Sequence, residues 1–335
     1  MTDTTLLILG ASGDLTRRLL LPGIGSLLER EPHRPVRIVG ADRADLSTED
    51  FADRVGAALA EGGCSREVVA GIRAQTAYYP IDVTDADALG AVIGEFAASE
   101  RLVAYFALPP SVTERACRAM LALDLPECLH LAMEKPFGQD EASARELNKV
   151  VARLAPDERV HRVDHFLGKS SVVDIMALRF ANRMLQAVWS AEHIESIEIA
   201  YDEQLALEGR AGYYDRAGAL VDMIQSHLLQ VMAVVTMEPP AEISDRELRD
   251  AKSAVLRATR MWGGDAAAAS RRGRYTAGTI SGRSVPDYLH ENGVDRDRDT
   301  ETLAQITVEV ANQRWPVCRS RSAPAKPSAR PASMW

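Results

Sequence analysis

The chain has 335 residues, of which 46% are hydrophobic, so it is long enough to bury a sizeable core and to form two domains. Lys and Arg number 39 against 48 Asp and Glu, and the resulting net charge of -9 argues against a general role in binding nucleic acid or a membrane surface. No basic stretch precedes the N-terminal apolar run and no apolar segment has the length of a membrane span, so we expect a cytoplasmic protein. The cysteines show neither a CxxC pair nor metal-ligand spacing, so we expect reduced thiols and no metal site.

Short apolar segments alternate with amphipathic stretches through the first half of the chain. The segments that predict strands are 6–8, 36–39, 77–81, 102–107 and 129–132. This alternation is typical of a parallel sheet covered by helices on both faces. We therefore predict an α/β, Rossmann-type, doubly wound nucleotide-binding domain over residues 1–158.

The pattern changes in the second half. Helices are predicted over 170–183, 217–235 and 244–259, and strands over 194–201 and 304–310. We expect residues 159–315 to form an α+β substrate domain with an antiparallel sheet. The segment 263–273 is rich in glycine and small residues and predicts an exposed loop. Residues 316–335 are rich in Pro, Ser, Ala and Arg without apolar periodicity, which predicts a disordered tail.

A glycine-containing turn follows the first predicted strand and opens a helical pattern. In this context glycines let backbone amides approach a pyrophosphate at a helix N-terminus. The spacing is G-x-x-G-x-L rather than G-x-G-x-x-G, so a plain strand-to-helix turn is the alternative. The candidate cofactor-binding residues in the turn are Gly10, Ser12, Gly13, Asp14 and Leu15.

The second predicted strand leads into Asp42 and Arg43, where the adenosine ribose of a dinucleotide would lie. Arg43 favours a 2′-phosphate, and Asp42 favours a 2′-hydroxyl. We expect NADP as the cofactor, with NAD as the open alternative. Lys135 follows the fifth predicted strand, at the end where doubly wound sheets bind ligands, so it is a candidate for contacts with nicotinamide and substrate. A surface lysine in a proline turn is the alternative.

Two later stretches collect histidines, carboxylates and a lysine, namely 161–169 and 212–227. Oxidation of an alcohol requires a base near neutral pH, and a carboxylate behind an imidazole fixes its tautomer and stabilises the imidazolium. Asp164 and Asp222 are the candidate carboxylates, while a satisfied core histidine is the alternative reading of a lone ring. His165 and Lys169 lie one turn apart if the chain is helical there, and would then clamp a phosphate.

Several motifs occur in the order of a known family. They read Gly-Ala-Ser-Gly-Asp-Leu-Thr-Arg-Arg-Leu-Leu-Leu-Pro, Glu-Lys-Pro-Phe-Gly, Arg-Val-Asp-His-Phe-Leu-Gly-Lys, Leu-Arg-Phe-Ala-Asn, and Gly-Tyr-Tyr-Asp followed by Asp-Met-Ile-Gln-Ser-His. From residue 5 to about residue 315 the chain resembles glucose-6-phosphate dehydrogenase. The matching positions include Thr300-Glu-Thr302 near the end of that range.

The resemblance implies oxidation of glucose 6-phosphate to 6-phosphogluconolactone with hydride transfer to NADP, the first step of the oxidative pentose phosphate pathway. It implies that His227 is the base and that Asp164 orients it. It implies that His165 and Lys169 bind the sugar phosphate. The residues implied in contacts with sugar hydroxyls are Glu203, Asp222 and Lys135. The full-length family forms homodimers or tetramers, and the oligomeric state of this chain stays open.

Some positions depart from the family pattern. Phe166 stands where a tyrosine is usual, so one hydroxyl contact to the phosphate is lost. Ser170 replaces a usual glutamate, and Ser226 replaces the common asparagine before the base. Asp42 adds a negative charge near the expected 2′-phosphate and weakens the prediction of NADP. The proposed base and its orienting acid are both present.

The resemblance stops after Trp315. The family continues with a motif similar to Trp-x-Gly-Val-Pro-Phe-x-Leu-Arg-Ser-Gly-Lys, and codons for Val317 to Arg330 can be chosen that spell this motif in a shifted frame. We therefore expect a frameshift near Trp315, and a genuine disordered tail is the alternative. The antiparallel sheet is then incomplete, the strands at 194–201 and 304–310 lack partners, and we expect a poorly folded second half with weak or lost activity.

Two other functions stay open from the sequence. One is another Rossmann-type sugar dehydrogenase, in which His165 and Lys169 would have no anion to bind. The other is a catalytically dead nucleotide-binding remnant, which would bind the cofactor without turnover.

Overall fold

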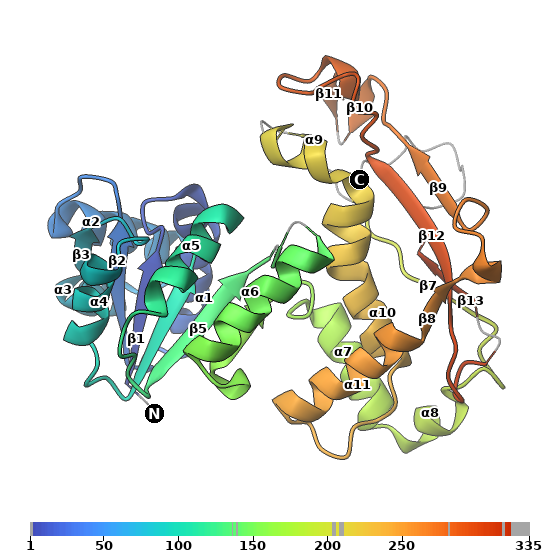
Figure 1. The fold of residues 1–335 in the computed structure, drawn as a ribbon, viewed down its shortest axis with the longest axis horizontal. Coiled ribbons are helices and arrows are strands. Elements are labelled where there is room, and N and C mark those ends of the chain that lie inside the picture. Colours follow the sequence, from blue (N-terminus) through green and yellow to red (C-terminus); the bar gives the residue numbers. More distant parts are fainter. Residues whose placement is uncertain are drawn as a thin grey trace. The chain divides into compact units, whose positions relative to one another are not determined.

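The computed structural model describes residues 3–135, 137–138, 140–202, 206–207, 211–280, 282–316 and 319–322. Figure 1 traces the chain from the blue N-terminal strands to the red C-terminal ones. The contacts within the chain separate it into two units after Val163. Each unit has a sheet and a buried apolar core of its own.

The first unit contains a parallel sheet of six strands. The strands are β1 (Thr4–Leu9), β2 (Val36–Asp42), β3 (Ala77–Pro80), β4 (Arg101–Phe106), β5 (Leu129–Glu134) and β6 (Val160–Val163). They lie in the order β3-β2-β1-β4-β5-β6, which is the order of a doubly wound nucleotide-binding fold. The predicted fold class is thus confirmed for this half. The sequence analysis missed β6, because this short strand has exposed polar residues at its centre. The predicted end of the first domain at residue 158 therefore falls before this strand.

Helices connect these strands. They are α1 (Leu21–Arg30) with the preceding π-helical η1 (Thr16–Leu20), α2 (Thr48–Glu61), α3 (Arg66–Gln75), α4 (Ala86–Glu95), α5 (Pro110–Met120), α6 (Glu141–Leu154) and the short 3-10 turn η2 (Asp157–Arg159). Local sequence sets where several of them begin. Ser47 caps α2 and shares a capping box with Asp50, and Asp140 does the same for α6 with Ser143.

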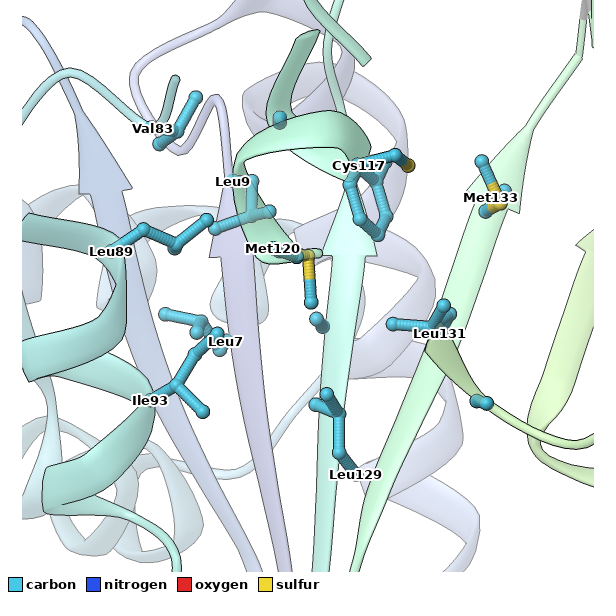
Figure 2. Packing of buried hydrophobic residues seen from close by; sticks show 14 of the residues in the cluster. Leu7, Leu9, Val83, Leu89, Ile93, Cys117, Met120, Leu129, Leu131 and Met133 are labelled. Atoms are coloured by element: carbon cyan, nitrogen blue, oxygen red, sulfur yellow. The ribbon is translucent and has the colours of Figure 1, made fainter. Parts of the chain in front are cut away.

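Apolar side chains cover both faces of this sheet, because successive residues of a strand point to opposite sides. Leu7 and Leu9 of β1 belong to one buried cluster, and Ile8 belongs to another. Figure 2 shows Leu7 and Leu9 facing Leu89 and Ile93 of α4. Burial on both faces explains why these strands read as continuous apolar runs in the sequence.

The second unit contains a long helical run and several shorter helices. Its helices are α7 (Ser170–Phe180), α8 (Arg183–Val188), α9 (Ala211–Ala219), the π-helical η3 (Leu220–Leu228), α10 (Leu229–Thr236) and α11 (Asp245–Ala258). The segments α9, η3 and α10 follow one another directly, with a kink at Gly218, where φ is 68°. Most residues of α10 are buried, and this helix packs against α7 and α11.

The run from Ala211 to Thr236 is long and apolar enough to cross a membrane, judged by length and composition alone. The prediction that no segment reaches that length is therefore wrong, because α9, η3 and α10 join end to end. Within the unit, 61% of the most apolar window of this run is buried. Such burial is the pattern of a core helix, whose apolar residues contact protein on most sides.

The second unit also contains a sheet of five strands. The strands are β7 (Ser196–Glu198), β8 (Thr259–Met261), β9 (Ser270–Gly273), β12 (Leu303–Val310) and β13 (Arg319–Ser322). The central strand β12 pairs antiparallel with β8, β9 and β13, and β13 pairs in parallel with β7. The remaining elements are the hairpin β10 (Gly278–Ile280) and β11 (Arg283–Val285) and the 3-10 turns η4 (Trp262–Gly264) and η5 (Tyr288–His290). The predicted α+β organisation with an antiparallel sheet is confirmed.

Two predictions for the second unit are wrong in part. The expected loop at 263–273 ends in β9, and the expected disordered tail contains β13. The strand β13 lies between β7 and β12, so the strands that were expected to lack partners are paired. Backbone N–H and C=O groups form strand pairs whatever the side chains are, and an open strand edge accepts any segment that can reach it. Residues 323–335 lie outside the described residues.

Candidate active site

Asp164, His165 and Lys169 lie on the turn between β6 and α7. The N–H groups of Leu167 and Lys169 donate to the carbonyls of Asp164 and Phe166, each at 3.1 Å. Oδ1 of Asp164 also accepts from the N–H of Phe166 at 3.0 Å. The turn is thus closed by its own backbone and by the Asp164 carboxylate. The segment is a tight turn rather than a helix, because α7 begins only after Lys169.

His227 lies on η3, in the middle of the long helical run. Hydrogen bonds in a π-helix join residues five apart, and such segments are frequent at functional sites. The hydroxyl of Ser226 donates to the carbonyl of Val221 at 2.8 Å with this spacing. The same spacing separates Asp222 from His227, so these two residues lie one π turn apart along the helix.

His227 and Asp164 form a buried acid-base pair. Nδ1 of His227 lies 2.6 Å from Oδ1 of Asp164, and the two side chains are 2% and 13% exposed. An ionised carboxylate only accepts hydrogen bonds, so Nδ1 carries the proton and Nε2 of the neutral ring is left as a proton acceptor. The other oxygen, Oδ2 of Asp164, is buried without a hydrogen-bond partner in the described part of the chain.

The environment keeps Asp164 ionised. Burial by itself raises the pKa of Asp164, but hydrogen bonds from His227 and the Phe166 amide, together with the neighbouring imidazoles, outweigh it. The net result is a pKa below the ordinary value of 3.8. A carboxylate that is charged at neutral pH can stabilise a proton on the imidazole beside it.

Aromatic rings hold the His227 imidazole from two sides. Phe166 stacks on it with ring centroids 4.1 Å apart and an angle of 19° between the planes. His165, which is exposed, meets it edge-on at 4.6 Å. These contacts leave the imidazole little freedom to rotate. The structure therefore brings three of the predicted residues together, namely Asp164, His165 and His227.

The ammonium of Lys169 lies over the rings of Phe166 and Tyr201. Its Nζ is 4.6 Å from the centre of the Phe166 ring and 4.8 Å from that of Tyr201. A cation over aromatic faces is attracted by their electron density, and this attraction restricts the positions that the ammonium can take. A cavity of about 490 Å³ is lined by Phe166, Lys169 and Tyr201 together with mostly apolar residues.

Lys252 on α11 is a candidate that the sequence analysis missed. Its Nζ donates to Oε1 of Gln230, which follows His227 by about one turn. Burial lowers the pKa of Lys252, and the negative charge of Asp164 acts in the opposite direction. The signal available in the sequence is a lysine on the apolar side of an amphipathic helix, close to positions such as Val255.

The other predicted substrate residues are placed separately. Asp222 accepts a hydrogen bond from the hydroxyl of Tyr213 at 3.2 Å. Lys135 is half-buried and directly follows β5 in the first unit. Glu203 lies outside the described residues.

The turn after β1 fits the close approach of a phosphate. Gly10 has a φ of 87°, and a Cβ there would lie 2.3 Å from the carbonyl oxygen of Ala107. The hydroxyl of Thr16 and the N–H of Gly13 both donate to the Gly10 carbonyl at 3.1 Å. Only glycine fits this position, because a side chain would collide with the backbone that follows β4. Asp14 and Leu15 form the first helical residues, and the exposed Asp14 pairs with Arg18 at 3.2 Å.

The end of β2 contacts this turn. Oδ2 of Asp42 accepts from the hydroxyl of Ser12 at 2.5 Å and from its N–H at 3.1 Å. The guanidinium of Arg43 pairs with Asp82 at 2.5 Å. The predicted cofactor residues Ser12 and Arg43 are thus both engaged with carboxylates.

Ligand atoms of Asp164, His165 and His227 lie within 4.8 Å of one another, a spacing that one metal ion would accept. The sequence gives no metal motif for them. The short bond between Nδ1 and the carboxylate already uses one such atom of His227 and one of Asp164. We therefore interpret the cluster as an acid-base pair with a neighbouring imidazole.

Comparisons with known proteins match both halves of the chain. Residues 7–174 match the model of the glucose-6-phosphate dehydrogenase NAD binding domain, and residues 176–317 match that of the glucose-6-phosphate dehydrogenase C-terminal domain. The chain is 35% identical over 319 residues to the glucose-6-phosphate 1-dehydrogenase of Dickeya dadantii and 38% identical over 319 residues to that of Gluconobacter oxydans. Each alignment covers 92% of this chain and 65% of the relative, so the chain spans slightly less than two thirds of their length.

A solved structure of glucose-6-phosphate dehydrogenase in complex with its substrate glucose-6-phosphate has a similar fold. It matches with a TM-score of 0.84 and 31% sequence identity. The match covers 96% of this chain and 69% of that one. The similarity therefore extends over both units of the chain described above.

Proposed function

The chain belongs to the glucose-6-phosphate dehydrogenase family, and on this premise we propose that it oxidises the C1 hydroxyl of glucose 6-phosphate with a nicotinamide dinucleotide as acceptor. The product is 6-phosphogluconolactone, and the reaction is the first step of the oxidative pentose phosphate pathway, in the cytoplasm. The partner is a small molecule, and the proposal includes no nucleic acid or membrane. The homodimer or tetramer of the full-length family stays an expectation for this chain.

The observation that carries this proposal is the short bond between His227 and Asp164. With Nδ1 donating to the carboxylate, Nε2 is the atom that takes the proton from the C1 hydroxyl. The positive charge that forms on the ring is stabilised by Asp164, whose pKa lies below its ordinary value. Phe166 and His165 fix the ring plane, so the accepting nitrogen points in one direction.

The sugar phosphate is held by His165 and Lys169. Both lie on the turn that also carries Asp164, and the His165 ring contacts the base. A dianionic phosphate attracts an imidazolium and an ammonium. Phe166 supplies no hydroxyl to this phosphate, so Lys169 carries more of the binding. The residues assigned to the sugar hydroxyls are Glu203, Asp222 and Lys135.

The cofactor is held by the turn after β1 and by the end of β2. When bound, the dinucleotide supplies the carbon that accepts the hydride. Gly10 and Gly13 shape the tight turn that leads into the helix, and the backbone N–H groups of Asp14 and Leu15 at the start of the helix are the proposed donors to the pyrophosphate. Ser12 lines the turn, with its N–H and hydroxyl both donating to Asp42. Arg43 favours NADP and Asp42 favours NAD, so two neighbouring side chains oppose each other in the choice of acceptor.

The proposal is tested by the absorbance of reduced nicotinamide when the purified chain receives glucose 6-phosphate with NAD or NADP. We expect turnover in the unmodified chain and at least a hundredfold loss in His227→Asn, about the contribution of a general base. His33→Asn is the matched control, because His33 is exposed and lies in the first unit. A chain that carries the family motif after Trp315 in the restored frame serves as the positive control.

The other outcomes identify the alternatives. Equal turnover of glucose without the phosphate would indicate another sugar dehydrogenase, since His165 and Lys169 would then be irrelevant. Dinucleotide binding without turnover in either chain would indicate a nucleotide-binding remnant. Full activity in His227→Asn would contradict the assignment of the base.

A further inference from the structure

The end of β2 and the glycine-containing turn are tied together by a carboxylate. Both the N–H and the hydroxyl of Ser12 donate to Oδ2 of Asp42. The N–H of Arg43 donates to Oδ1 at 2.7 Å, so both oxygens of this half-buried carboxylate are positioned. The N–H of Gly10 adds a bond to the carbonyl of Ala41 at 2.9 Å. Asp42 is therefore fixed at the place where the adenosine ribose lies in this fold.

The side chain of Arg43 pairs with a different carboxylate. Its guanidinium pairs with Asp82, and the two side chains are 63% and 38% exposed. Asp82 is held in place by the amide and the hydroxyl of Thr84, at 2.9 and 2.7 Å. Hydrogen bonds from Thr84 and from Arg43 lower the pKa of Asp82 to about 2, so this carboxylate is charged throughout the physiological range. The guanidinium that a 2′-phosphate requires is thus already paired.

The two forms of the dinucleotide make opposite demands on these groups. A ribose 2′-hydroxyl is a donor, and Oδ1 of Asp42, which accepts only the N–H of Arg43, has a lone pair left for it, whereas Oδ2 already accepts two bonds from Ser12. A 2′-phosphate carries about two negative charges and only accepts, so it would meet Asp42 and Asp82 as like charges. To contact it, the guanidinium of Arg43 would have to leave Asp82.

We propose that Asp42 is the residue that selects the acceptor, and that it favours NAD over NADP by accepting from the ribose 2′-hydroxyl and repelling a 2′-phosphate. This inference rests on the proposed function, because it concerns the same dinucleotide site. Ser12 positions Asp42 for this role. Asp82 pairs with Arg43 and so keeps its guanidinium from binding a 2′-phosphate.

The test is titration calorimetry of NAD and of NADP against the whole chain, without sugar phosphate. The unmodified chain is expected to bind NAD more tightly than NADP. In Asp42→Ala the affinity for NADP rises about tenfold and that for NAD falls, since one repulsive charge and one acceptor are removed. Asp42→Asn keeps an oxygen for Ser12, so it preserves the local fold and raises NADP affinity with a smaller change for NAD.

Asp45→Ala is the matched control. Asp45 is exposed on the same loop and its replacement changes the net charge by the same amount. It should shift the affinities for NAD and NADP by similar small factors. Tighter binding of NADP by the unmodified chain, or an unchanged ratio of the two affinities in both Asp42 variants, would overturn the inference while leaving the proposed function intact. Failure of the unmodified chain to bind either dinucleotide would overturn both.

Discussion

His227 is almost completely buried, and everything it can do chemically follows from what surrounds it. Asp164 fixes the proton on Nδ1, and the stacked Phe166 fixes the ring plane. The same contacts make the stability of the folded chain depend on pH. Because the pKa of Asp164 lies below its unfolded value, this carboxylate contributes stability above about pH 3.8, and the contribution is lost as pH falls through the folded pKa.

Lys252 gives a prediction at this scale. A cation near the pair disfavours a second positive charge on His227, so Lys252→Met makes protonation of the base easier. The acidic limb of the kcat/KM profile should move to higher pH by about half a unit to one unit. Lys252→Arg keeps the charge and should leave the limb in place. A pH profile that is identical in Lys252→Met and the unmodified chain would show that Lys252 only supports α11.

The long helical run of the second unit changes character along its length. It bends at Gly218, forms the π segment that carries His227, and ends as the buried helix α10. Glu301 holds the bend, because its Oε1 accepts from the N–H of Leu220 at 3.1 Å and its carbonyl accepts from that of Ala219 at 3.1 Å. A motif residue that lies far away in sequence thus sets where η3 begins.

Gly218→Ala tests this arrangement. The φ of 68° strains an alanine, and its Cβ would lie 2.6 Å from Oε1 of Glu301. We expect a loss of about 1–3 kcal/mol in the free energy of unfolding, measured by urea denaturation. Gly212→Ala on the same helix has nothing within 4 Å of the added Cβ and should be neutral or slightly stabilising. Equal effects of the two substitutions would contradict the role assigned to the bend.

At the scale of the whole molecule, each of the two units has buried apolar clusters of its own. In the first unit they cover both faces of the parallel sheet, and in the second unit one cluster lies between the helices and the β12 sheet. The last described strand, β13, joins β7 to β12 and gives backbone partners to both. The order of the second sheet therefore depends on residues outside the range matched by the family resemblance.

A chain ended after Pro316 tests the contribution of β13. Without this strand, β12 and β7 present unpaired backbone groups, so we expect aggregation and hydrogen exchange at Ile306 and Val308 that is about tenfold faster. Exchange at Leu7 and Ile8 of β1 is the internal control and should not change. Unchanged exchange at Ile306 would show that β13 does not protect β12.

The sequence by itself determined the doubly wound sheet, because its strands are buried on both faces and read as continuous apolar runs. It also determined the candidates Asp164 and His227, since motifs record residue types and spacing. The residues alone left Asp164 and Asp222 open as carboxylates, and the family resemblance implied Asp164. The contact between Asp164 and His227 itself depends on the tertiary structure, because it joins segments far apart in the chain. The same holds for Lys252, which reaches the region from another helix, and for β9 and β13, whose pairing depends on an available strand edge rather than on apolar periodicity. At the end of β2 the sequence offered both Asp42 and Arg43, and only the tertiary structure placed them beside Ser12 and Asp82, because these contacts join segments far apart in the chain.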